Sequence, residues 1–155
     1  MKLTNYIKVY KNVVPDSFCD EMIQKFERNS FQYRYQKRAN PDRNFKMSFN
    51  QIHIGQETNW TEQNNYLMKL FPTYVDKYRE DCNITENQWP INWVYEKIRM
   101  KRYQPNREEF FSPHVDVTSY VDARRFLVFF LYLDNNSAGQ TSFPQLDLGS
   151  NCVKG

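Results

Sequence analysis

An uninterrupted apolar run, Phe-Leu-Val-Phe-Phe-Leu-Tyr-Leu at residues 126–133, limits the folds open to this chain more than any other stretch. A continuous run of this length, rather than an alternating one, is typical of a strand covered on both faces. Turn-forming residues follow at 134–139, and the short strand that begins at Gln140 is ended by Pro144. We therefore expect a buried core strand, a turn and a short strand in succession.

A histidine and an aspartate stand two residues apart before this run, in the segment Ser112-Pro113-His114-Val115-Asp116. In a strand, residues i and i+2 point to the same face, so the side chains of His114 and Asp116 are able to reach one ion. Imidazole and carboxylate are two of the three groups in the facial triad that holds non-haem Fe(II). We interpret the pair as metal ligands. The alternative is a surface histidine beside a solvated aspartate, because so short a motif also arises by chance.

The composition indicates one folded domain that spans residues 1–155. Hydrophobic residues make up 40% of the chain and aromatic residues 17%, which excludes a disordered chain. The net charge of +3 permits an anionic partner without requiring one.

The 3 cysteines are far apart and form no Cys-x-x-Cys pair, so neither a disulfide framework nor a zinc site is indicated. No apolar stretch reaches the length of a membrane span, and no apolar signal core follows Met1. We therefore expect a cytoplasmic protein with reduced thiols and no membrane partner.

The two halves of the chain differ in pattern. Ser17, followed by acidic residues, resembles a capping-box start of a helix that ends near Arg28. Thr61 is expected to cap a second helix, which Pro72 should kink or break. From Ile91 the pattern is typical of strands. The sequence thus predicts a helical support region with short strands at 1–90 and a region of core strands at 91–155.

These motifs together resemble a known family. The Ser112-to-Asp116 segment, the apolar run with its Tyr-Leu-Asp ending and Ala-Gly-Gln-Thr-Ser-Phe-Pro at 138–144 are similar to the catalytic half of the Fe(II)- and 2-oxoglutarate-dependent oxygenases. The prolyl 4-hydroxylase-like branch is the most similar. The resemblance is specific over residues 98–143, while the upstream half fits only the general plan of the family.

The resemblance implies an α+β fold, mostly β, with a double-stranded β-helix (jelly-roll-like) core and N-terminal helices packed on its major sheet. It implies a dioxygenase that hydroxylates a C–H bond of a prolyl or related substrate while 2-oxoglutarate is decarboxylated to succinate. His114 and Asp116 would be the iron ligands. Tyr103 and Tyr132 would contact 2-oxoglutarate, Tyr132 through its distal carboxylate, although in a chain with 11 tyrosines both are also compatible with ordinary packing.

Two elements of the family pattern are missing from this sequence. The family has a second histidine well downstream of the His-x-Asp motif and then an Arg or Lys that pairs with 2-oxoglutarate. This chain reaches Gly155 without either, so we expect a C-terminally incomplete oxygenase core. The other histidine, His53, lies far upstream in a strand-like segment, where a packed or hydrogen-bonded side chain is the simpler interpretation.

Two further interpretations stay open. A catalytically inactive relative would act as a binding module for a small molecule or a peptide. A nucleic-acid-directed oxygenase would use the segment from Phe31 to Asn44, in which four basic residues alternate with tyrosines. A solvated strand and loop is the simpler explanation of that segment, because Asp42 dilutes its charge. The motifs identify neither the substrate nor the oligomeric state.

Overall fold

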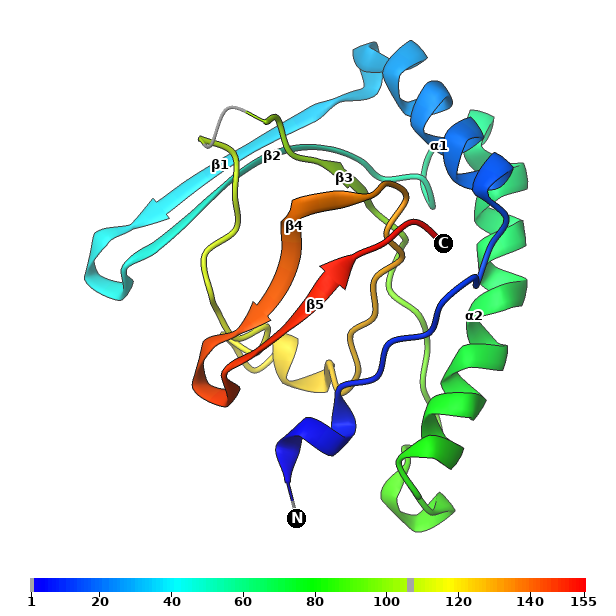
Figure 1. Ribbon diagram of the computed structural model, residues 1–155, viewed down its shortest axis with the longest axis vertical. Helices are drawn as coiled ribbons and strands as arrows, with labels where there is room; N and C mark the ends of the chain where they lie inside the picture. Colours follow the sequence, from blue (N-terminus) through cyan, green and yellow to red (C-terminus); the bar gives the residue numbers. More distant parts are fainter. Residues whose placement is uncertain (1, 106–107) are drawn as a thin grey trace. The chain divides into compact units, whose positions relative to one another are not determined.

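The computed structural model describes residues 2–105 and 108–155. Within these residues two α-helices accompany two small antiparallel sheets, so the predicted α+β class is confirmed (Figure 1). The helices are α1 (Asp16–Arg28) and α2 (Thr61–Asp81), and the strands are β1 (Arg34–Asn40), β2 (Phe45–Ile52), β3 (Met100–Arg102), β4 (Asn136–Phe143) and β5 (Leu148–Cys152). The first sheet has the order β1-β2-β3, and β4 pairs with β5 in the second.

The chain divides into two compact units, each assembled from two separate stretches of sequence. The first unit holds Gln51–Lys101 together with the N-terminal residues up to Lys8, and the second holds Val9–Asn50 and Arg102–Gly155. Each unit buries its own apolar side chains. In the first unit these are Ile52, Ile54, Trp60, Leu67 and Val75, and in the second they are Val14, Cys19, Met22, Phe26 and Phe49.

Helix α1 belongs to the second unit and buries one apolar face. Its buried residues Cys19, Met22 and Phe26 recur at helical spacing. The helix begins after Pro15 without a side-chain cap, so the expected capping box at Ser17 does not form. At its other end the Asn29 side chain donates a hydrogen bond of 2.7 Å to the carbonyl of Lys25, which ends the helix at the predicted place.

Helix α2 belongs to the first unit and runs through Pro72 without a break, contrary to one of the two expectations for this residue. Thr61 is its first residue rather than its cap, and the Thr61 hydroxyl donates to the carbonyl of Thr58 at 2.7 Å. The helix ends in a Schellman motif, because Asn83 has a φ of 52° and the amide of Ile84 donates to the carbonyl of Arg79 at 2.8 Å.

Both hairpins of the second unit use the same kind of connection. In each, a proline starts a short 3-10 turn, and a residue in the left-handed region then leads into the next strand. Pro41 and Asn44 (φ 47°) join β1 to β2, and Pro144 and Asp147 (φ 49°) join β4 to β5. Asparagine and aspartate tolerate this backbone region better than most residues, which explains their positions. The predicted stop of the strand at Pro144 is confirmed.

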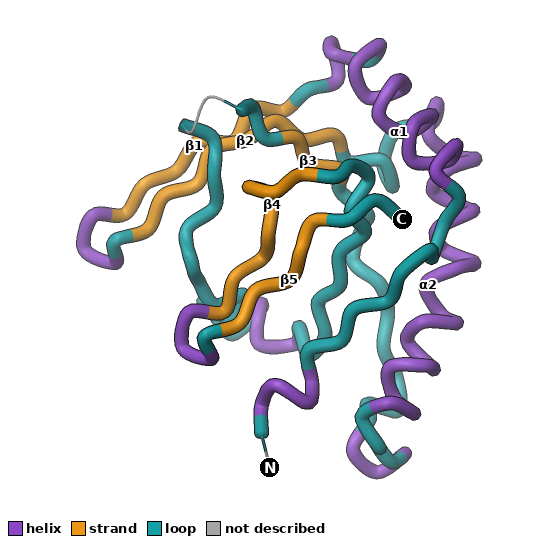
Figure 2. Tube along the Cα trace, viewed as in Figure 1, coloured by secondary structure: helices purple, strands orange, loops and turns teal. Residues whose placement is uncertain are grey.

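Three predicted strands are absent or much shorter in the structure. Residues 91–99 have no regular structure before β3, residues 110–116 hold only an isolated bridge at Phe111, and residues 126–133 form no strand. Figure 2 shows the described residues between β3 and β4 mainly as loop. The apolar run is also not buried, because Phe126, Val128, Phe129 and Phe130 are exposed. Strand-like composition therefore does not produce a strand here, because a strand also requires a hydrogen-bonded neighbour.

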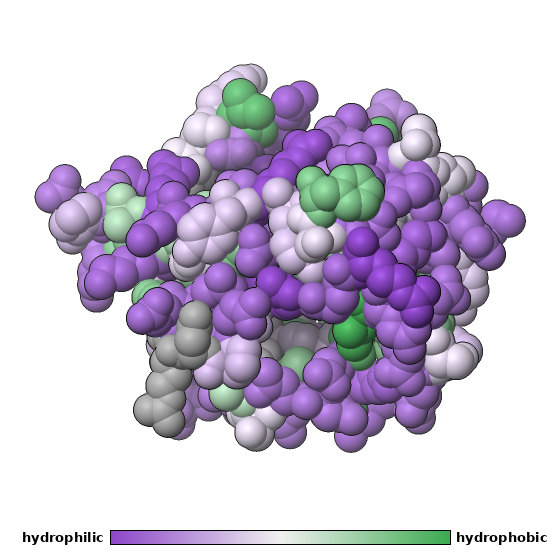
Figure 3. All heavy atoms as spheres, turned by 90° about the horizontal axis from the view of Figure 1, so that it is seen from above, coloured by the Kyte–Doolittle hydropathy of each residue, from purple (hydrophilic) through white to green (hydrophobic). Residues whose placement is uncertain are grey.

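Most side chains visible in Figure 3 are hydrophilic, and the hydrophobic ones stand in separate groups. Within the residues described, neither helix combines the length and the apolar character that crossing a membrane requires. Cys19, Cys82 and Cys152 are all free thiols, as the cysteine pattern predicted.

Candidate functional site

The segment that carries the His-x-Asp motif is attached to β2 within the second unit. The amide of Ser48 donates to the carbonyl of Phe110 at 2.8 Å, and the amide of Ser112 donates to the carbonyl of Lys46 at 2.9 Å. The buried Ser112 hydroxyl also accepts a hydrogen bond of 2.9 Å from the amide of Lys46. These bonds fix the chain immediately before His114.

The His114 ring is held in one orientation by the carbonyl of Ser112. Its Nδ1 lies 2.7 Å from that oxygen. A carbonyl oxygen can only accept, so Nδ1 carries the hydrogen, and the neutral ring then presents the lone pair of Nε2. An Nδ1–H bond to a backbone carbonyl is the usual support of a metal-binding histidine.

The structure brings His114 and Asp116 together, although by a bend rather than by the alternation of a strand. His114 Nε2 lies 3.4 Å from Asp116 Oδ1, and the two side chains are 31% and 39% exposed. A metal ion about 2.1 Å from each of two donors in octahedral or tetrahedral geometry separates those donors by about 3.0–3.4 Å. The pair therefore fits one metal ion, and the same distance also permits an ion pair when His114 is protonated.

A row of aromatic rings lies beside this pair. Phe111 stacks on His114, with ring centroids 3.9 Å apart and planes 8° from parallel, and Phe45 meets His114 edge-on at 6.1 Å. Phe49 contacts Phe111 at 5.6 Å and Tyr103 at 5.3 Å. Tyr103 thus belongs to the same row of rings as the candidate ligand.

The hydroxyl of Tyr103 stays protonated at neutral pH. Burial of this group, with a smaller effect of the Glu109 carboxylate, raises the pKa of Tyr103 to about 12, although 41% of the residue surface is exposed. A protonated phenol donates a hydrogen bond, so Tyr103 is suited to an anionic ligand.

Tyr132, the other predicted contact of 2-oxoglutarate, precedes β4 and contacts the β4–β5 hairpin through its hydroxyl. Its hydroxyl is 2.5 Å from the hydroxyl of Thr141 and 3.1 Å from that of Ser150. Thr141 and Ser150 face each other as a cross-strand pair. Three hydroxyls therefore meet at one place, which is an arrangement able to bind a carboxylate.

A third metal ligand is not found beside the pair. The residues that the structure describes contain no group of three or more His, Cys, Asp or Glu side chains able to hold a metal ion. His53, in the first unit, has both ring nitrogens next to glutamine amides, at 3.0 Å from Gln51 Nε2 and 3.2 Å from Gln56 Oε1. Its surroundings agree with a hydrogen-bonded histidine.

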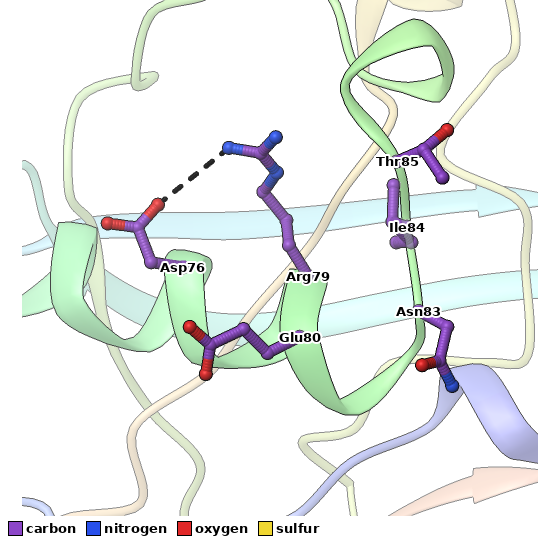
Figure 4. A pocket seen from close by; sticks show the side chains of 6 residues that line it. All are labelled: Asp76, Arg79, Glu80, Asn83, Ile84 and Thr85. Carbon is purple, nitrogen blue, oxygen red and sulfur yellow. Dashed lines mark ion pairs between the residues drawn. The ribbon is translucent and has the colours of Figure 1, made fainter.

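The first unit has a depression of about 720 Å³ at the end of α2 (Figure 4). Asp76, Arg79 and Glu80 line it from the helix, and Asn83, Ile84 and Thr85 line it from the segment that follows. Arg79 lies 3.9 Å from Asp76 and over the ring of Trp89 at 5.2 Å. None of the predicted site residues lines this depression.

Sequence reasoning missed three residues that shape the site. Ser112 was noted only as part of a motif, while Thr141 and Ser150 were not singled out. The cross-strand pairing of Thr141 with Ser150 depends on the register of the β4–β5 hairpin. A hairpin assignment around the turn at Pro144 would have indicated it.

Comparisons of the chain with protein-family models, with curated proteins and with solved structures found no match of any of the three kinds.

Proposed function

We propose that His114 and Asp116 are two ligands of Fe(II) in a 2-oxoglutarate-dependent dioxygenase that hydroxylates a C–H bond of a prolyl or related substrate. One observation carries this proposal. The hydrogen bond from Nδ1 to the Ser112 carbonyl leaves the lone pair of His114 Nε2 available to a metal ion. This nitrogen lies 3.4 Å from Asp116 Oδ1. The resemblance of residues 98–143 to this family supplies the reaction type.

The chain's own residues would position the ligands and limit water. Ser112 fixes the tautomer of His114, and Phe111 and Phe45 cover its ring. Arg125 donates to the carbonyl of Asp116 at 3.4 Å and so helps to hold the second ligand. Fe(II) and 2-oxoglutarate, when bound, would activate O2, which is the oxidant: one oxygen atom would hydroxylate the substrate C–H bond, and the other would enter succinate as 2-oxoglutarate loses CO2.

Tyr132 and Tyr103 are the proposed contacts of 2-oxoglutarate. The hydroxyl group of Tyr132, joined by those of Thr141 and Ser150, would bind the distal carboxylate. Tyr103 would donate a hydrogen bond from its protonated hydroxyl, and its raised pKa keeps that proton in place even in alkaline solution. Both roles use hydroxyl donors toward a dianion.

The proposal includes the finer fold and setting expected from the family. The strands would belong to a double-stranded β-helix, and the protein would act in the cytoplasm on a small molecule or a peptide.

The donor set favours a second candidate function. Because the described residues offer two grouped donors rather than three, the same side chains would also suit a catalytically inactive binding module for a small carboxylate or a peptide. In that case Tyr132, Thr141 and Ser150 would still bind a carboxylate.

Anaerobic titration with Fe(II) and 2-oxoglutarate tests the proposal. We expect the visible charge-transfer band of the bidentate co-substrate on ferrous iron, followed by succinate formation when oxygen and a substrate are admitted. His114→Ala should abolish the band, and His53→Ala, as the matched control, should keep it. A folded chain that gives no band would contradict the dioxygenase and leave the binding module, which binding of 2-oxoglutarate without iron would then support.

A further inference from the structure

The hairpin of β1 and β2 carries a concentration of positive charge. We call this segment the basic ribbon and define it as residues 34–46. This segment contains one carboxylate, Asp42, and the cations Arg34, Lys37, Arg38, Arg43 and Lys46. The whole chain has a net charge of +3, so the rest of the chain is slightly negative. The positive charge is thus concentrated in the ribbon.

Most of these cations have no internal ion pair or side-chain hydrogen bond among the residues described. Lys37, Arg38, Arg43 and Lys46 are all exposed. Among the residues that the structure describes, none of these four makes an ion pair or a side-chain hydrogen bond. Exposed cations without an internal partner are available to neutralise the charges of an anionic partner.

An aromatic ring lies among these cations. Tyr35 is 55% exposed, and its hydroxyl bonds to that of Ser48 at 2.8 Å across the hairpin. The bond places Tyr35 and Ser48 on one face, and strand alternation adds Lys37 and Lys46 to that face. The ring is therefore oriented by Ser48 and accompanied by two lysines.

We propose that the basic ribbon binds single-stranded nucleic acid without sequence preference, with the cations on phosphates and Tyr35 stacked on a base. Single-strand binding combines a cationic surface with exposed rings, because unpaired bases offer a π-face. A duplex, whose bases are already stacked, would not use the ring. This inference does not depend on the proposed iron site.

Fluorescence anisotropy with a short labelled single-stranded DNA of mixed sequence tests the proposal, with the iron-free full chain. The logarithm of the binding constant should fall with the logarithm of the salt concentration, and three phosphate contacts would give a slope of about −2. Lys37→Glu, Arg38→Glu and Arg43→Glu together should lower the affinity at least about tenfold and flatten this slope. The corresponding triple Gln variant should lower it less.

A charge-matched control separates the ribbon from general attraction. Lys11→Glu, Lys69→Glu and Lys97→Glu together change the net charge equally at exposed positions outside the ribbon. This control should keep most of the affinity. An equal loss in both triple variants, each shown to be folded by circular dichroism, would overturn the proposal.

The ring gives a second test. Tyr35→Ala should lower the affinity for single-stranded DNA about tenfold with an unchanged salt slope, whereas Tyr35→Phe should keep most of it. Vesicles of anionic phospholipid and duplex DNA serve as competitors. Tighter binding to either of them than to the single strand, or no effect of Tyr35→Ala, would show that the ribbon is not a single-strand site.

Discussion

Strand β2 and the apolar run at residues 126–133 have the same length and opposite fates. β2 is 8 residues long and buries Phe49 and Ile52. Its apolar residues are interspersed with polar ones such as Lys46 and Asn50. The run contains no charged residue, yet it forms no strand and leaves Phe130 64% exposed. The more apolar segment is therefore the less buried one.

The difference lies in the neighbours of each segment. β2 has β1 and β3 on its two sides in the sheet, and β1 is its partner through a short turn. Residues 126–133 have no described strand on either side; within the run, the Tyr132 carbonyl accepts from the amide of Gly155 at 3.0 Å and the Tyr132 hydroxyl meets that of Thr141. Apolar composition favours burial, but pairing decides where a strand forms.

The largest difference in stability should appear when one phenylalanine ring is truncated in each segment. Phe49 is 2% exposed and contacts Phe111 and Tyr103, so Phe49→Ala should lower the free energy of unfolding by about 3–5 kcal/mol. Phe130→Ala should change it by less than about 0.5 kcal/mol. Urea denaturation monitored by circular dichroism measures both values.

The comparison breaks if Phe130→Ala proves as costly as Phe49→Ala. Phe130 would then be covered in solution, as a core strand of a double-stranded β-helix would be.

A smaller effect is expected at Tyr132, where the run contacts the β4–β5 hairpin. Tyr132→Phe removes the hydroxyl that lies next to those of Thr141 and Ser150, and we expect a loss of about 1 kcal/mol in unfolding free energy. Tyr120→Phe, at a highly exposed position, is the matched control and should be neutral. Equal stability of the two variants would mean that the hydroxyl cluster does not hold the run.

The smallest effect concerns pH and the ring row beside β2. Burial raises the pKa of Tyr103 to about 12 from 10.0, so the folded state keeps a proton that the unfolded state loses between these values. Its contribution to stability is complete below pH 10 and is lost as the pH rises toward 12. Tyr103→Phe should make that loss shallower in thermal melts, and Tyr120→Phe should not. If Tyr103→Phe leaves the dependence of the melting temperature on pH unchanged, the Tyr103 hydroxyl is solvated rather than buried.

Local patterns predicted the elements that are specified within a few residues of sequence. The end of α1 near Arg28 follows from helical spacing, and the end of β4 follows from Pro144. The strands expected at 91–99 and 126–133 depend on distant partners, which a propensity pattern does not contain. Asn83, whose left-handed backbone ends α2, could have been read as a helix stop, since asparagine is common there.

The candidate site was predictable in part for the same reason. His114 and Asp116 are close in sequence, so their proximity of 3.4 Å needed only local geometry, although a bend rather than a strand provides it. The support from Ser112 depends on pairing with Lys46, which is 66 residues away. Such long-range bonds follow from the assembled sheet and not from the motif.

Fe(II) binding to the chain alone tests the central claim most directly. Anaerobic equilibrium dialysis would compare the wild-type protein with His114→Ala, Asp116→Ala and the control His53→Ala. If His114 and Asp116 are the ligands, the wild type and His53→Ala bind Fe(II) with the same affinity, and each of the other two variants loses at least about tenfold. Unchanged affinity in His114→Ala and Asp116→Ala, or loss in His53→Ala alone, would contradict the assignment.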